Sequence, residues 1–346
     1  MDAGEWIESF VRGAMCLLGI VGNNWLAVRS IPSKTSQIRT NEMLFINLAI
    51  SNLITNVLVD LPDTMADFAD EWFLGRTYCA IFQFCSDLSA TSSIVSTSLI
   101  TIYWHQKLVG SLSRGTAPVR LDSLRLVAAL LAGGWAMAVV FSAPHFYFVS
   151  LDTSNSSSDD CVESFPSPVA RQTYEAMYLT LANAVPIAGM VFSSIQIVIT
   201  LLRHQARIVA MNSEAHSGAA SAQANGDAPP GNQAQAPNAP SAQEPSKEPS
   251  NQAQGTVQPS PKEAPTRPNK ASGSPSNQVR AAKSVVAVAS VFLVCWLTHM
   301  VLRISSNVHE SSLVVEVASY IAASYTCIIP YIFLYGVKKL SCSCRR

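Results

Sequence analysis

Polar and ionisable side chains recur at helical spacing inside several long apolar stretches of this sequence. Gln83, Asp87 and Thr91 stand at positions i, i+4 and i+8, which lie on one face of a helix. Two further sets follow later in the chain: Trp296, His299 and Arg303 in one stretch, and Glu316 with Tyr320 in another. A guanidinium binds a carboxylate or sulfate through two parallel hydrogen bonds, and a carboxylate attracts an amine. The residues therefore indicate recognition of a small polar molecule.

Two interpretations of the charged residues remain open. Arg303 pairing with Glu316 across a short outer loop would only hold two helices together, and Asp87 would then be the unpaired group that attracts an amine. If Arg303 is free, it suits an anion. Arg303 and His299 share one helical face while the acids come from separate stretches, which favours an anionic or zwitterionic ligand.

Other polar residues have structural alternatives. Tyr178, with Tyr174, provides an aromatic wall in one interpretation and anchors its helix at a membrane interface in the other. Asn23 and Asn52 are predicted to form an interhelical hydrogen bond. No base is placed beside a Ser or Thr, so no catalysis is predicted, and neither a cofactor nor a metal is expected.

The apolar stretches themselves predict a protein that crosses a membrane many times. Hydrophobic residues make up 49% of the 346 residues and charged residues only 13%, where soluble proteins carry about 25%. The net charge of zero gives no electrostatic footprint for nucleic acid. Seven stretches are long enough to span a bilayer: 10–30, 43–62, 79–103, 124–144, 174–202, 284–304 and 313–336.

The charges between the stretches predict the orientation, because Lys and Arg close to a span stay in the cytosol. Basic residues follow the odd-numbered stretches: Arg29, Lys34 and Arg39; Lys107, Arg114, Arg120 and Arg125; Arg203 and Arg207; and Lys338, Lys339, Arg345 and Arg346. The alternate loops are acidic. We therefore predict an all-α membrane protein, a seven-transmembrane helix bundle with its N-terminus outside and its C-terminus inside.

The chain divides accordingly into four parts. Residues 1–207 hold the first five spans, 280–337 the last two, and 338–346 a short cytosolic tail. Between them, residues 208–279 contain eleven of the nineteen prolines together with much Ala, Gln and Ser. This composition predicts a disordered third cytosolic loop.

Two thiols fall on the outer side. Cys79 opens the third span and Cys161 lies in the next outer loop, so a disulfide between them is predicted in an oxidising compartment. The same loop carries Asn155-Ser156-Ser157, an acceptor for N-glycosylation. The remaining span cysteines are predicted to be buried free thiols: Cys16, Cys85, Cys295 and Cys327.

These features resemble the rhodopsin-like G-protein-coupled receptors, with several departures. Gly22-Asn23 in the first span and the outer disulfide match that superfamily. Tyr103-Trp104-His105 stands where the superfamily has Asp-Arg-Tyr, and Asn52 replaces its second-span Asp. Cys295-Trp296-Leu297-Thr298 keeps the Trp of the sixth-span motif without its Pro, and Ile329-Pro330 lacks the Asn of the seventh.

A narrower family accommodates the departures. Leu48-Ala49, Asn52 and Pro62-Asp63-Thr64-Met65-Ala66 with Phe68 look like the second span and first outer loop of vomeronasal type-1 receptors. Leu202-Arg203-His204 with Val209 and Arg280-Ala281-Ala282-Lys283-Ser284 are similar to its fifth-span end and sixth-span entry. The match excludes only 210–278, and Tyr103 to Val109 is more similar to the fish branch, the olfactory receptor class A-related proteins.

The resemblance implies a plasma-membrane chemosensory receptor for a small water-borne, pheromone-like ligand, bound in the outer half between spans three, five, six and seven. It also implies coupling to a heterotrimeric G protein through inner span ends. The candidates are Trp104, His105, Lys107, Arg203, Arg207, Arg280 and Lys283. Basic members of this set equally fit residues that meet anionic membrane lipid. Bitter-taste receptors, which lack the Cys79–Cys161 arrangement, and a small-molecule transporter are the alternatives.

The predicted topology has a direct test at Asn155. We expect a glycan there, because the loop faces the lumen during synthesis. Endoglycosidase should increase the gel mobility of the wild type to that of Asn155→Gln. If the untreated wild type and Asn155→Gln migrate identically, the predicted glycan at Asn155 is contradicted. In intact cells, protease should leave residues 208–279 uncut, and cleavage there would reverse the orientation.

Overall fold

The computed structural model describes the backbone of most of the chain: residues 3–32, 38–112, 119–152, 160–224, 275–306 and 312–337. Side chains are not described at 3–5, 111, 152, 160, 212–224, 275–278, 299–306, 312–319, 322 and 323. The chain forms two compact units, one made of Met1–Gln205 with Gly273–Arg346 and the other of Ala206–Ser272.

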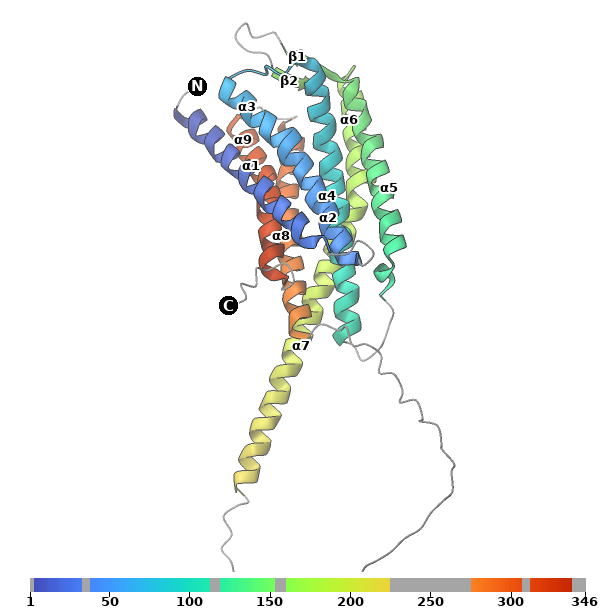
Figure 1. Cartoon of the computed structure of the whole chain (residues 1–346), viewed down its shortest axis with the longest axis vertical. Helices are drawn as coiled ribbons and strands as arrows, with labels where there is room; N and C mark the ends of the chain where they lie inside the picture. The colour runs from blue at the N-terminus through green and yellow to red at the C-terminus, as the bar shows by residue number, and fades with distance from the viewer. Residues whose placement is uncertain are drawn as a thin grey trace, which may run out of the picture. The chain divides into compact units, whose positions relative to one another are not determined.

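Each predicted span corresponds to a long helix or a run of consecutive helices (Figure 1). In chain order these are α1 (Ala3–Ser30); α2 (Thr40–Thr55), η2 (Asn56–Asp60) and α3 (Leu61–Ala69); α4 (Gly75–Leu112); α5 (Leu124–Ser142); α6 (Pro168–Met177), η5 (Tyr178–Ala184) and α7 (Val185–Ala224); α8 (Pro275–Ser306); and α9 (Ser312–Gly336). Short 3₁₀ turns η3 (Arg120–Asp122) and η4 (Ala143–Phe146) flank α5. The seven-helix prediction is confirmed.

The second and fifth spans each contain a π-helical turn, η2 and η5, which the sequence did not predict. After η2, Pro62 occupies the first turn of α3, and the Leu58 carbonyl, four residues earlier, accepts from the Tyr78 hydroxyl at 3.4 Å. The helix ends at Asp70, whose φ of 59° is left-handed, and Gly75 begins α4 with φ of 73°. These two residues turn the chain sharply between the second and third spans.

Hydropathy alone does not mark α4 as a membrane span. Among the described residues, five helical stretches are long and apolar enough to cross a membrane: Trp6–Ser30, Thr40–Ala69, Leu124–Phe146, Pro168–Met211 and Val279–Thr298. With 38 residues, α4 is long enough, but its many Ser and Thr residues keep it out of that group. A helix of this kind is stable in a bilayer only where other helices surround it.

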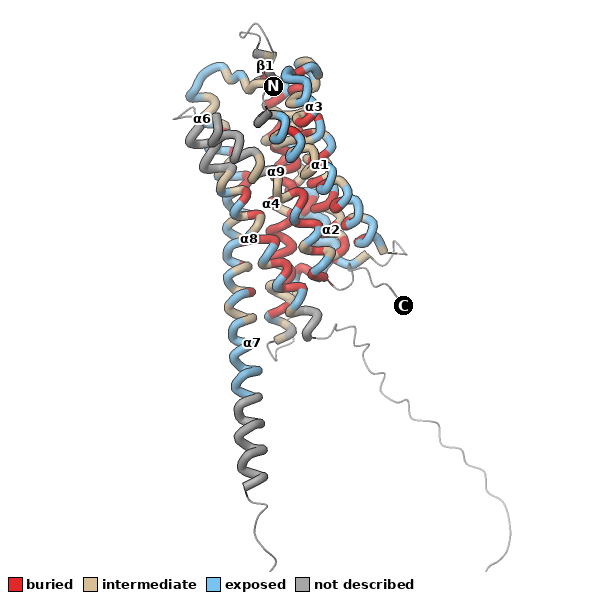
Figure 2. The backbone as a smooth tube through the Cα atoms, turned by 90° about the vertical axis from the view of Figure 1, so that its left-hand side faces the viewer, coloured by how far each residue is buried: buried red, intermediate tan, exposed pale blue. Residues whose placement is uncertain are grey.

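The structure places α4 inside the bundle, packed against α2, α5 and α8. Its Ser89, Ser93 and Thr97 are fully buried. Figure 2 shows buried residues along the inner helices and exposed residues along the outer faces of the bundle. The prediction that the third span is the central helix is confirmed.

Side-chain hydrogen bonds join α2 and α4 in a regular series, which we call the α2–α4 ladder. Its rungs are Asn47 to Ser96 at 2.6 Å, Ser51 to Ser92 at 2.7 Å and Thr55 to Ser89 at 2.8 Å. The α2 members are spaced i, i+4 and i+8, so they share one helix face. Each rung satisfies polar groups that lipid cannot hydrate.

A second set of amides joins α1, α2, α4 and α9. Asn52 Nδ2 donates to Asn23 Oδ1 at 3.1 Å, and Ser93 Oγ donates to Asn52 Oδ1 at 2.9 Å. Asn23 Nδ2 also donates to the carbonyl of Thr326 at 2.9 Å. The predicted interhelical hydrogen bond between Asn23 and Asn52 is therefore confirmed, and both side chains lie in the core together with that of Ser93.

The outer loop forms a hairpin of β1 (Val149–Asp152) and β2 (Asp160–Glu163), paired antiparallel with Leu151 opposite Cys161. A disulfide joins Cys161 to Cys79 at the start of α4, with Cα atoms 5.6 Å apart. The predicted disulfide is confirmed, and so is the burial of the four span cysteines as free thiols. The N-terminus lies at the same end of the bundle as the hairpin (Figure 1).

The boundaries of the predicted cytosolic loop differ from the structure. Helix α7 continues through residues 208–224 and α8 begins at Pro275, so both flanks of the segment 208–279 are helical. Ala, Met, Glu and Gln in 208–224 are good helix formers, which allows an existing helix to extend at little cost. Residues 225–274, the predicted tail 338–346 and Asn155 lie outside the described residues.

The disulfide should be required for export. Cys79→Ser and Cys161→Ser each open a loop whose ends are 82 residues apart, a loss on the order of 4–5 kcal/mol in the chain-entropy model. We expect both variants to stay inside the cell in surface-labelling experiments. Cys85→Ser, which changes a buried free thiol, is the matched control and should reach the surface. Normal display of the first two variants would contradict the expectation.

Candidate functional site

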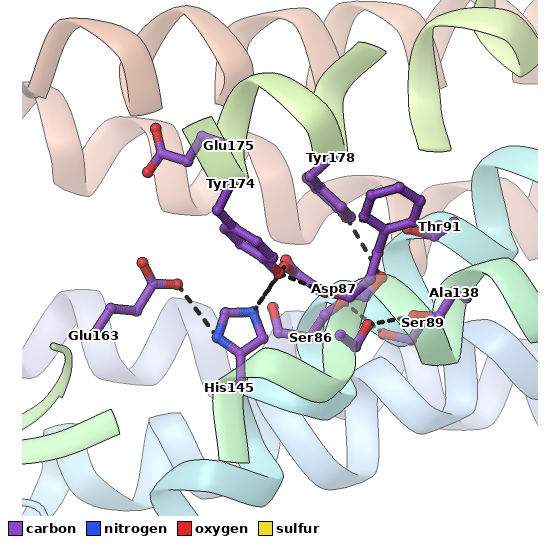
Figure 3. A network of polar contacts seen from close by, with 12 residues as sticks. Ser86, Asp87, Ser89, Thr91, Ala138, His145, Glu163, Tyr174, Glu175 and Tyr178 are labelled. Carbon is purple, nitrogen blue, oxygen red and sulfur yellow. Dashed lines mark hydrogen bonds and ion pairs between the residues drawn. The ribbon is translucent and has the colours of Figure 1, made fainter. Parts of the chain in front are cut away.

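A network of polar side chains lies below the β1–β2 hairpin, where α4, η4 and α6 meet (Figure 3). It contains Asp87, His145, Tyr174 and Tyr178, with Glu163 and Glu175 at its edge (Figure 3). Asp87 and His145 are buried, with 7% and 1% of their surfaces exposed. We call these six residues the outer network.

Asp87 is the centre of the outer network. Its Oδ2 lies 2.8 Å from His145 Nε2 and 3.1 Å from the Tyr174 hydroxyl. An ionised carboxylate only accepts hydrogen bonds, so the proton on His145 belongs on Nε2 in this arrangement. Asp87 is therefore not the unpaired acid that one interpretation of the sequence requires. That interpretation of Asp87 is corrected, because η4 places His145 against the carboxylate.

His145 lies between two carboxylates. Its Nδ1 is buried, lies 3.8 Å from Glu163 Oε1, and makes no hydrogen bond with any described residue. Glu163 is also 4.0 Å from Arg171, which donates to Glu175 at 3.1 Å. The hairpin thereby contributes one acid to the network and α6 contributes a compensating cation.

The two tyrosines form the wall on the α6–η5 side. Their rings are stacked, with centroids 6.3 Å apart and planes 11° apart. The Tyr174 hydroxyl lies 2.7 Å from the carbonyl of Phe141 as well as near Asp87, and its single hydrogen can serve one acceptor at a time. Thr91 donates to the Tyr178 hydroxyl at 3.1 Å. Tyr178 is buried, so the aromatic-wall interpretation fits it better than an interface anchor.

Local sequence explains how α6 presents these rings. Ser167 caps the helix by accepting from the Ala170 N–H at 3.1 Å, and Pro168 occupies the first turn. The π-helical turn η5 begins at Tyr178, and the side-chain Nδ2 of Asn183 donates to the Tyr178 carbonyl at 3.2 Å. Such turns are frequent at functional sites, because they change which face a side chain presents.

The other predicted ligand residues are less closely joined to this network. Gln83 and Trp296 are partly buried on α4 and α8. The Tyr320 ring on α9 lies beside Arg12, whose guanidinium is 5.5 Å from the ring centroid and 2.7 Å from both Asp63 and Asp67. The side chains of His299, Arg303 and Glu316 lie outside the described residues, so their predicted roles stay predictions.

At the opposite end of the bundle, the predicted coupling residues differ in accessibility. Trp104 is buried, and Lys107 donates to the Tyr103 hydroxyl at 2.7 Å, while that hydroxyl lies 3.4 Å from Asp122. The ring of Trp104 is packed into the core, and its coupling role stays a prediction. His105 is partly buried; the exposed members of the set are Arg203, Arg207, Arg280 and Lys283.

The family model described as 7 transmembrane receptor (rhodopsin family) matches residues 23–333, which is most of the chain. The chain belongs to this receptor family. Its members are receptors with seven membrane-spanning helices, so this receptor is a multi-pass protein of the plasma membrane and not an enzyme.

Similar curated proteins include peptide and light receptors. The receptor is 29% identical over 185 residues to neuropeptide Y receptor type 1 of Xenopus laevis, covering 51% of this chain and 48% of that protein. It is 24% identical over 196 residues to the gonadotropin-releasing hormone receptor of Octopus vulgaris, covering 56% and 46%. The receptor thus matches about half the length of these curated relatives.

The crystal structure of squid rhodopsin has the same fold. It superposes with a TM-score of 0.66 at 17% identity and covers 98% of this chain and 84% of that one. At this identity the similarity concerns the fold alone. The vomeronasal type-1 branch of the family, indicated by short sequence motifs, stays a prediction.

The bond between Asp87 and His145 predicts non-additive effects on stability. Asp87→Ala and His145→Ala each leave a buried polar partner without its bond, at about 1–3 kcal/mol. We expect both to lower the thermal unfolding midpoint of the purified receptor, and the double variant to be less destabilised than the sum. Thr173→Ala, an exposed change on α6, is the control. Strict additivity would show that the two side chains are not coupled.

Proposed function

We propose that this receptor is a chemosensory receptor of the vomeronasal type-1 kind, in its fish branch, which binds a small water-borne ligand and activates a heterotrimeric G protein. The observation that carries the proposal is the outer network, which buries ionisable side chains together at the end of the bundle that faces outside. Ionisable residues at such a depth in a membrane protein mark ligand or ion sites. The sequence motifs in the second, fifth and sixth spans support the narrower family.

The ligand pocket extends from the outer network towards α8 and α9. In this proposal, Gln83, Thr91 and Tyr178 contribute from the α4 and η5 side, and the proposed contacts on the other side are Trp296, His299, Arg303, Glu316 and Tyr320. Because Asp87 already accepts from His145 and Tyr174, its charge is satisfied inside the protein. This supports Arg303 as the group that meets the ligand, and a carboxylate or sulfate as the chemistry it recognises.

Coupling would take place at the exposed inner ends of α7 and α8, through Arg203, Arg207, Arg280 and Lys283. His105 contributes at the end of α4, where its ring lies 6.5 Å from that of Phe192. Basic side chains on these helix ends complement acidic segments of a partner.

A peptide ligand is the second candidate function. Neuropeptide Y receptor type 1 and the gonadotropin-releasing hormone receptor are named for such ligands, and the identity to the former is 29%. A bitter-taste receptor is disfavoured by the Cys79–Cys161 disulfide. A transporter is disfavoured by the family.

The proposal is tested by a ligand screen. The receptor would be expressed with a promiscuous G protein and exposed to organic acids, bile salts, steroids, amines and, as a separate class, the peptides named above. We expect a response to a small organic anion. A response confined to peptides would replace the proposal with the second candidate.

Variants at position 303 test the charge of the ligand. Against the anion found in the screen, Arg303→Ala should abolish the response at unchanged surface level, and Arg303→Lys should recover part of it, because an ammonium lacks the planar fork. Arg76→Lys, which alters an exposed outer cation at the start of α4, is the control. A fully sensitive Arg303→Ala receptor together with an insensitive Asp87→Asn receptor would assign an amine instead.

A further inference from the structure

An apolar groove of about 720 Å³ runs between α1, α8 and α9 in the cytosolic half of the bundle. Leu18 contributes from α1, Lys283 and Ala287 from α8, and Ile328, Tyr331 and Tyr335 from α9. The groove is separate from the outer network, which α4, η4 and α6 form at the other end. Ligand recognition does not explain this groove, and Lys283 is the lining residue that it shares with the proposed coupling set.

Close helix contacts form the floor and one end of the groove. Gly336 packs directly on Ser284, so that any side chain at Gly336 would overlap Ser284 and separate α8 from α9. At the deep end, the Tyr331 hydroxyl donates to the Leu18 carbonyl at 3.0 Å and ties α9 to α1. The groove is therefore bounded by the close contact of Gly336 with Ser284 and by the Tyr331 ring.

The groove opens to the lipid side of the bundle. Leu18 is 53% exposed, Ile328 40% and Tyr335 81%. In a protein that spans the membrane, apolar surface of this kind at mid-depth is covered by hydrocarbon. A hydrocarbon chain is the occupant that the groove's lining fits.

One cation stands at the cytosolic rim of the groove. Lys283 is exposed and forms no ion pair with any acidic side chain that the structure describes. Arg280, one turn earlier, donates a hydrogen bond to the Tyr335 carbonyl, and its guanidinium lies 5.6 Å from the centroid of the Tyr335 ring. The rim therefore carries positive charge where the inner leaflet presents anionic headgroups.

We propose that this groove binds an anionic phospholipid of the cytoplasmic leaflet. One acyl chain lies along Leu18, Ala287 and Ile328, and the phosphate and its anionic headgroup meet the ammonium of Lys283. A phospholipid joins the two chemistries that the groove presents, an apolar channel and a cation at its cytosolic end. The site depends on the membrane topology of the receptor and not on its being chemosensory.

Native mass spectrometry of the full-length receptor tests this site. The purified protein would be incubated with equal amounts of phosphatidylserine and phosphatidylcholine of identical acyl chains, and the retained adducts compared. We expect the wild type to retain more phosphatidylserine. Lys283→Gln should lower the ratio of phosphatidylserine to phosphatidylcholine about fivefold, as one lysine at a leaflet surface does.

Two further variants separate charge from shape. Arg125→Gln removes an exposed cation at the cytosolic start of α5, away from the groove, and should leave the ratio unchanged. Ala287→Trp fills the groove without changing charge and should reduce retention of both lipids. Only variants whose thermal unfolding midpoint equals that of the wild type would be compared.

Three results would overturn the proposal. Equal retention of the two lipids by the wild type would show no preference for an anionic headgroup. An unchanged ratio in Lys283→Gln, or an equal fall in Arg125→Gln, would remove Lys283 as the recognising group. Full retention of both lipids by Ala287→Trp would place the lipid elsewhere.

Discussion

The α2–α4 ladder is the constraint on which the rest of the bundle depends. A membrane interior supplies no water, so every Ser, Thr and Asn at that depth needs a partner from another helix or from its own backbone. Asn47, Ser51 and Thr55 provide those partners for the serines of α4. The ladder allows a helix too polar for lipid to occupy the centre, and the more apolar helices can then face the bilayer around it.

The outer network continues the same principle with charge in place of hydroxyls. Asp87 lies half a turn beyond Ser89, the last α4 residue of the ladder. Its partners are His145 and Tyr174 in place of side chains of α2. Because η4 and α6 supply those partners, the Asp87 carboxylate joins the ends of the fourth and fifth spans to the third, in addition to the packing of α4 on α5. The disulfide then fixes the hairpin, and with it Glu163, above this point.

Sequence reasoning succeeded where a residue's depth or side of the membrane determines its partner. Hydropathy predicted the seven spans. The charges of the loops placed Cys79 and Cys161 on the same outer side, which predicted their disulfide. The depth of Asn23 and Asn52 inside apolar spans predicted their hydrogen bond. His145 was missed because a single histidine at a span end has no periodic neighbour to indicate its role. The extension of α7 was missed because prolines further along dominate the composition of the segment and mask its Ala-rich start.

The position of α5 between these two polar sets has a mechanical consequence. Its Trp135 donates to Asn47, a member of the ladder, at 2.9 Å, and less than two turns later its Phe141 carbonyl lies 2.7 Å from the Tyr174 hydroxyl. An α-helix transmits axial rotation with little internal twist, because each backbone hydrogen bond links successive turns. A rotation of α5 large enough to break one contact would strain the other as well. The second and fifth spans are therefore mechanically coupled to each other through the fourth.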